Sequence, residues 1–167
     1  MIMLTQTQIQ DQIKRLAETI NEFHTGQDTV VLCNLTGSFY FTADLTRELT
    51  FEMILEPIEV KSYSGEFEKR DPEWILKPQS DLSHKTVYIV DDIIETGESI
   101  KFIISYIRDH YDDVDIKVIS LIRRKESTVN FDVDQFNGFE VEADKWLVGY
   151  GMDDCNGYNR NLPYISC

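Results

Sequence analysis

The sequence predicts an α/β protein in which a parallel sheet carries helices on its faces. Short apolar, β-branched runs at residues 29–33, 86–90 and 116–121 are typical of strands buried on both faces of such a sheet. Segments with apolar residues three and four positions apart separate these runs and predict helices. The alternating order of strands and helices favours right-handed crossovers and therefore parallel strands.

The first helix is predicted from an amphipathic pattern near the start of the chain, formed by Ile9, Ile13, Leu16, Ile20 and Phe23. Thr5 or Thr7 is the expected N-cap, and Gly26 is the expected end of the helix. A turn at residues 36–38 leads into a second helix that runs to about Leu49.

Further elements are expected in the middle and the tail. Residues 58–63 are typical of a strand, the polar segment 64–72 of a mobile loop, and residues 74–76 of a short return strand. A third helix is indicated by Ile100, Ile103, Ile104 and Ile107. The tail from Phe136 has two short apolar runs before an end rich in Gly and Asn.

Composition indicates one domain over residues 1–167. A hydrophobic share of 42% is enough for a core without disulfides. Cys33, Cys155 and Cys167 are widely spaced and include no CxxC pair, which supports neither a disulfide framework nor a zinc site. Because we find no run typical of a signal peptide or a membrane span, we expect a soluble, cytoplasmic protein.

The charge balance limits the possible partners. Sixteen basic and 30 acidic residues give a net charge of -14, which repels nucleic acid and anionic membranes. Residues 123–125 form the one dense basic patch of the sequence. A small anionic substrate remains compatible with this charge, because a site can be locally positive or can use a metal ion.

The segment Val87–Ser99, VYIVDDIIETGES, carries the clearest chemical signal. It places Asp91 and Asp92 after a buried strand, followed by a small-residue turn that opens a helix. Ligands bind at this end of the strands in open parallel sheets. Backbone N–H groups and hydroxyls at residues 96–99 suit a phosphate at a helix N-terminus, and two carboxylates suit a vicinal diol. Together these features describe a site for a ribose 5-phosphate.

Shorter pieces of this segment are also typical of a strand end and an ordinary turn, but the whole string is more specific. It closely resembles the signature with which phosphoribosyltransferases bind phosphoribosyl pyrophosphate (PRPP). Four further segments resemble the hypoxanthine-guanine branch of that family: residues 35–45, 60–65, 143–154 and 158–165. The resemblance implies a type I fold, with a parallel-sheet core, a flexible active-site loop and a small hood of N- and C-terminal segments. It also implies transfer of the 5-phosphoribosyl group to hypoxanthine or guanine, giving IMP or GMP.

The resemblance implies roles for the matching residues of this chain. The 5-phosphate would be bound by Thr96, Gly97, Glu98 and Ser99, and the ribose hydroxyls and magnesium by Asp91 and Asp92. Pyrophosphate would be bound by Thr36, Gly37, Lys61 and Arg160. Glu95 stands at the place of the proposed catalytic base, and Asp153 would reach the magnesium shell. The purine would lie among Arg124, Lys145, Trp146 and Leu147.

Structural interpretations compete with some of these roles. By itself Trp146 is more typical of a core residue than of a stacking platform, and Lys61 and Arg160 are more typical of solvated surface charges. Asp153 is compatible with a simple acidic turn.

Three positions depart from the family's pattern. Thr36 replaces a basic residue of the pyrophosphate loop, Glu95 replaces an Asp, and Arg124 replaces a Lys that donates to the 6-oxo group of the purine. Arg and Lys differ at such sites, because a guanidinium donates in fixed directions and an ammonium is a compact charge.

These departures keep two other functions open: a PRPP- or nucleotide-binding regulator without turnover, and a transferase for another base such as xanthine. The expected cofactor is Mg²⁺, the expected ligands are PRPP and a 6-oxopurine, and the expected assembly is a homodimer or homotetramer.

Overall fold

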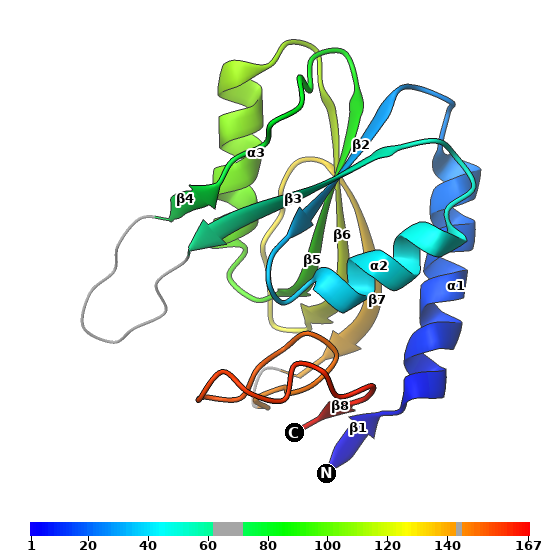
Figure 1. The fold of residues 1–167 in the computed structure, drawn as a ribbon, viewed down its shortest axis with the longest axis vertical. Coiled ribbons are helices and arrows are strands. Elements are labelled where there is room, and N and C mark those ends of the chain that lie inside the picture. Colours follow the sequence, from blue (N-terminus) through cyan, green and yellow to red (C-terminus); the bar gives the residue numbers. More distant parts are fainter. Residues whose placement is uncertain (62–71, 143–144) are drawn as a thin grey trace.

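The computed structural model describes residues 1–61, 72–142 and 145–167, and it shows a six-stranded sheet with the strand order β4-β3-β2-β5-β6-β7 (Figure 1). The strands of this sheet are β2 (Thr29–Asn34), β3 (Ile54–Lys61), β4 (Glu73–Leu76), β5 (Thr86–Ile94), β6 (Asp115–Arg124) and β7 (Asp134–Val141). All pairs are parallel except β3 with β4, so β4 is the expected return strand. The predicted fold class is confirmed.

Helices α1 (Gln6–Phe23), α2 (Phe39–Glu48) and α3 (Glu98–His110) cover the two faces of this sheet. Successive strand residues point to opposite faces. Val31 and Tyr88 belong to the buried cluster that contains α1 and α2, whereas Val30 and Val87 belong to the cluster that contains α3. The central strands are therefore buried on both faces, which explains why their sequences are continuously apolar.

A separate two-stranded antiparallel sheet forms from β1 (Ile2–Leu4) and β8 (Ile165–Ser166). Figure 1 shows this pair and the tail before it beside the end of the large sheet where β6 and β7 stop. Leu147 and Met152 of the tail are buried in the cluster of α1 and α2. This arrangement is the expected hood, although the sequence patterns did not predict its two strands.

The first helix begins as predicted and ends early. The Thr5 side chain caps it by accepting a 3.3 Å hydrogen bond from the Gln8 N–H. The helix ends at Phe23 rather than at Gly26, because His24 has extended backbone angles and stacks on Phe51 with ring centroids 3.9 Å apart.

Several strands are longer than predicted, β3 and β5 among them. β3 begins at Ile54, four residues before the predicted start, because Ile54 already pairs with Val30 of β2. β5 continues to Ile94, because Asp91 still pairs with Ser120 of β6. Asp91 and Asp92 thus lie inside the strand and not after it. Among the helices that the structure describes, none has the length and apolarity that a membrane span requires.

Candidate active site

A cavity of about 250 Å³ lies where the carboxyl ends of β2, β3 and β5 meet the start of α3. Its lining includes many of the predicted residues: Gly37, Asp91, Asp92, Glu95, Thr96, Gly97, Glu98, Ser99 and Arg160. A larger cavity of about 570 Å³ lies at the amino ends of β6 and β7, and its lining contains none of the predicted site residues. The ends of parallel strands have therefore brought the predicted residues together at one edge of the sheet.

The turn before α3 depends on Gly97. This residue is the N-cap of the helix and has φ 70° and ψ 13°, which is the left-handed region that favours glycine. A Cβ atom at this position would lie 2.8 Å from the ring of Phe131 and 2.9 Å from Val129 Cγ2. The local packing thus requires glycine, and the helix N-terminus that follows it provides backbone donors for an anion.

Asp91, which is buried, and Asp92, which is half-buried, form an acidic pair. The Asn34 amide donates to Asp91 Oδ1 at 3.2 Å, and the Ile93 N–H donates to Asp92 Oδ1 at 2.9 Å. Burial, followed by repulsion from Asp92, raises the pKa of Asp91 well above its ordinary value. Burial also raises the pKa of Asp92. A cation or a hydroxyl-bearing ligand beside the pair would relieve this unfavourable arrangement.

Two loops pack on each other and on Asp92 beside this pair. A Cβ atom at Gly37 would overlap the carboxylate of Asp92, and a Cβ atom at Gly151 would overlap the carbonyl oxygen of Gly37. Arg160 holds the outer loop, because it donates to the Gly151 carbonyl at 2.6 Å and pairs with Asp153 Oδ1 at 3.1 Å. Its charge also lowers the pKa of Asp92, opposing the effect of burial.

A smaller cavity, of about 150 Å³, adjoins the 250 Å³ cavity at Asp92, Ile93 and Glu95. Trp146, Leu147 and Asp153 line its other side. The Trp146 side chain is not part of the core: it is 68% exposed, and its Nε1–H donates to the Asp153 carbonyl at 3.2 Å. Leu147 is buried, and Lys145 is exposed. An aromatic ring at an open cavity is available for stacking on a planar ligand.

Glu95 and Arg124 pair across the ends of β5 and β6. Arg124 Nε donates to Glu95 Oε1 at 2.9 Å, and the Arg124 side chain is buried while that of Glu95 is half exposed. This contact joins two of the three positions that depart from the family's pattern.

The remaining predicted residues lie at the margin of the site. Thr36 is exposed at the start of the loop before α2, and the Leu35–Thr36 peptide bond is cis. Lys61 is exposed at the end of β3. The predicted mobile loop falls almost entirely on residues 62–71, outside the described residues.

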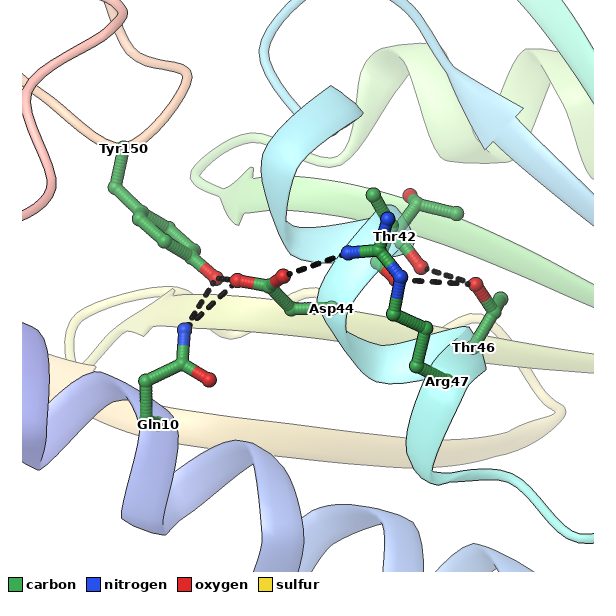
Figure 2. A network of polar contacts seen from close by, with 7 residues as sticks. Gln10, Thr42, Asp44, Thr46, Arg47 and Tyr150 are labelled. Atoms are coloured by element: carbon green, nitrogen blue, oxygen red, sulfur yellow. Dashed lines mark hydrogen bonds and ion pairs between the residues drawn. The ribbon is translucent and has the colours of Figure 1, made fainter.

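Sequence patterns missed several supporting residues. Asn34 contacts Asp91 because β2 and β5 are neighbours, and a polar residue at the end of an apolar strand was the available signal. Figure 2 shows another group, in which Gln10 of α1 and Tyr150 of the tail both donate to Asp44 of α2. These residues are more than 30 positions apart, and no spacing rule predicts their contact.

Comparison with known proteins agrees with this geometry. The chain matches the phosphoribosyl transferase domain over residues 3–154 and belongs to that family. The hypoxanthine-guanine phosphoribosyltransferase of Aquifex aeolicus (strain VF5) is 34% identical over 166 residues, covering 98% of this chain and 92% of that protein.

Two further relatives indicate the same branch. The hypoxanthine-guanine-xanthine phosphoribosyltransferase of Tritrichomonas foetus is 30% identical, covering 98% of this chain and 88% of that protein. A crystal structure of a hypoxanthine phosphoribosyltransferase from Staphylococcus aureus has a TM-score of 0.88 at 27% identity, covering 99% of this chain and 89% of that one. The resemblance inferred from the motifs is confirmed.

Proposed function

We propose that the protein transfers the 5-phosphoribosyl group of PRPP to hypoxanthine or guanine, which gives IMP or GMP and pyrophosphate. The observation that carries this proposal is that the acidic pair Asp91–Asp92 and the Gly97 turn line one cavity. The names of the relatives from Aquifex aeolicus and Tritrichomonas foetus support the same reaction.

PRPP would extend across this cavity from the helix to the outer loops. Its 5-phosphate would accept hydrogen bonds from the backbone and hydroxyls of residues 96–99, while Asp91 and Asp92 accept from the ribose hydroxyls. Pyrophosphate would lie at the main chain of Thr36 and Gly37, with Lys61 and Arg160 as the nearby cations. Glycine is suited to positions 37 and 151 beside this proposed site, because a Cβ atom at either position would disrupt the packing of the loops.

Magnesium is the proposed cofactor. Mg²⁺ in such sites is held by one or two carboxylates, by water and by substrate phosphates, not by a complete protein cage. Asp91, Asp92 and Asp153 line the two cavities, and one or two of these acids would hold the ion. No cluster of three or more metal-binding side chains occurs among the described residues. A bound Mg²⁺ would neutralise negative charge on the leaving pyrophosphate.

The residues of the chain mainly position the reactants and stabilise charge. The bond from purine N9 to the anomeric carbon forms as the bond to pyrophosphate breaks, and pyrophosphate leaves with the electron pair. Glu95 would take the proton that the purine loses at N7. The ring of Trp146 would stack on the purine and the Leu147 backbone would read its edge, beside Lys145.

The proposal extends to the state of the protein in the cell. We propose a cytoplasmic protein, folded as one domain over residues 1–167 and assembled as a homodimer or homotetramer. It would bind neither nucleic acid nor membranes, and the net charge of -14 supports this exclusion.

One assay tests the function against both alternatives. The protein is mixed with Mg²⁺, PRPP and hypoxanthine, guanine, xanthine or adenine, and pyrophosphate release is measured. We expect turnover with hypoxanthine and guanine and little with adenine, because the Lys145 ammonium can only donate and adenine presents a donor where 6-oxopurines present an acceptor. PRPP binding without release on any base would indicate a regulator. A marked preference for xanthine would indicate the other-base alternative, and efficient use of adenine would contradict the proposal.

A further inference from the structure

The Arg124 side chain makes most of its possible hydrogen bonds within the protein. Its Nε and Nη2 atoms each lie 2.9 Å from Glu95 Oε1. Nη1 donates to the Glu142 carbonyl at 2.8 Å, and Nη2 donates to the Lys145 carbonyl at 2.8 Å. The side chain is only 7% exposed. Every nitrogen of the guanidinium therefore has a protein partner, and these contacts use four of its five N–H donors.

Arg124 lines the purine side of the site, and its two carbonyl partners lie in the segment just before the proposed purine platform. Lys145 directly precedes Trp146 and Leu147 in the sequence, and Glu142 lies four positions before Trp146. Trp146 and Leu147 line the same 150 Å³ cavity as Glu95 and Arg124. One guanidinium thus connects the carboxylate of Glu95 to the segment that leads into the proposed purine platform. The contacts of Arg124 therefore link the position of the Glu95 carboxylate to that of the segment before Trp146.

The lengths of the two side chains are matched to this geometry. Asp at position 95 would withdraw the carboxylate by about one C–C bond, roughly 1.5 Å, and would stretch the 2.9 Å contact beyond hydrogen-bonding distance. Lys at position 124 would offer one nitrogen in place of a planar fork, and could not span a carboxylate and two carbonyls in fixed directions.

We infer that Arg124 is a positioning residue, which holds Glu95 against the purine platform and does not read the 6-oxo group itself. Glu95 in place of the family's Asp and Arg124 in place of its Lys are then two changes that compensate for each other. This inference rests on the proposed function, and it assigns recognition of the purine oxygen to groups other than Arg124.

A double-mutant cycle tests the pairing. Wild type, Glu95→Asp, Arg124→Lys and the double variant are compared with hypoxanthine and with guanine, at saturating Mg²⁺ and PRPP. Each single change is expected to lower kcat by about tenfold or more, within the range for a displaced acid-base group, and the double variant is expected to recover most of that loss. The hypoxanthine-to-guanine ratio of kcat/KM should stay within about twofold of wild type in Arg124→Lys.

Arg123→Lys is the matched control. Arg123 donates to Gln135 Oε1 at 2.5 Å and to the Val129 carbonyl at 2.6 Å, away from the Glu95 carboxylate. When Arg123→Lys is combined with Glu95→Asp, the free-energy effects of the two changes on kcat should add, and kcat should not recover. Thermal unfolding of every variant separates loss of folding from loss of positioning.

The outcomes are distinct. The inference would be overturned if the losses of kcat in Glu95→Asp and Arg124→Lys simply multiplied in the double variant. It would also be overturned if Arg124→Lys changed the hypoxanthine-to-guanine ratio. Either result would leave the proposed function intact. A folded wild type that binds PRPP and converts no base would overturn the proposed function, and the inference with it.

Discussion

The Tyr150 hydroxyl donates a 2.5 Å hydrogen bond to Asp44 Oδ2 and thereby joins the tail of the chain to α2 (Figure 2). The Gln10 amide donates to the same carboxylate oxygen at 2.7 Å. Burial, together with the hydrogen bond to Asp44, raises the pKa of the Tyr150 hydroxyl, which therefore remains a donor at neutral pH. Because Tyr150 precedes Gly151, this contact also supports the loop that packs on Gly37.

Tyr150→Phe should loosen this loop. Loss of the hydroxyl leaves Asp44 with fewer donors, which should cost about 1 to 3 kcal/mol of unfolding free energy. We also expect a higher KM for PRPP with a smaller change in kcat, because the affected loop borders the proposed pyrophosphate site. Tyr106→Phe on α3 is the control and should leave the KM for PRPP unchanged. An unaltered PRPP KM in folded Tyr150→Phe would separate this network from substrate binding.

Gly97→Val should abolish PRPP binding. Valine resists the φ of 70° at this position, and its side chain would clash with Phe131 and Val129. Calorimetric titration with PRPP and Mg²⁺ measures the effect. Gly97→Asn is the comparison, since Asn tolerates left-handed angles better than valine does. If folded Gly97→Val bound PRPP as tightly as wild type, the phosphate would have to bind elsewhere.

Glu95→Gln tests the proposed proton acceptor. Gln is similar in size and cannot exchange the proton, so turnover should fall by about 10²- to 10⁴-fold. PRPP affinity should survive, because the backbone donors of the Gly97 turn are unchanged. If Glu95 serves only as an acid near the helix N-terminus, turnover would fall by less than about tenfold and Glu95 would leave the mechanism.

The acidic pair should make the ligand-free protein less stable as the pH rises. The folded-state pKa of Asp91 lies above the ordinary value of 3.8, so the folded protein binds more protons than the unfolded chain between these two values. The resulting stabilisation is present at acidic pH and is lost as the pH rises through the folded-state pKa, by at most about 1.4 kcal/mol per pH unit for each such group.

Asp91→Asn removes this titration. In the absence of ligands it should therefore be more stable than wild type at pH 8, and the difference should shrink toward pH 4. Urea unfolding over this pH range is the measurement, and Asp11→Asn at an exposed position of α1 is the control. The opposite result would be an unfolding free energy of wild type that rises relative to that of Asp91→Asn as the pH increases. It would show that the Asp91 carboxylate is stabilised in the folded protein.

The sequence by itself determined the central strands, the three helices and the turn at Gly97. Continuous β-branched runs and helical spacing act over a few residues, so the local pattern already contains the physical cause. The segment from Asp91 to Ser99 was recognisable for the same reason, since the acids, the turn glycine and the helix start are contiguous. Two short strands were missed: β1 and β8 pair across almost the whole chain, and each is too short to show a period of its own.

Only the tertiary structure decided which side chains meet. Asn34 reaches Asp91 because β2 lies beside β5, and the glycines at 37 and 151 meet because two distant loops stack. The pairing of Glu95 with Arg124 is the clearest case. From the sequence, Arg124 was expected beside a purine. The contacts of its guanidinium with two backbone carbonyls and a carboxylate follow only from the fold. A hydrogen-bond donor is defined by its residue type, whereas its partner depends on packing that brings distant segments together.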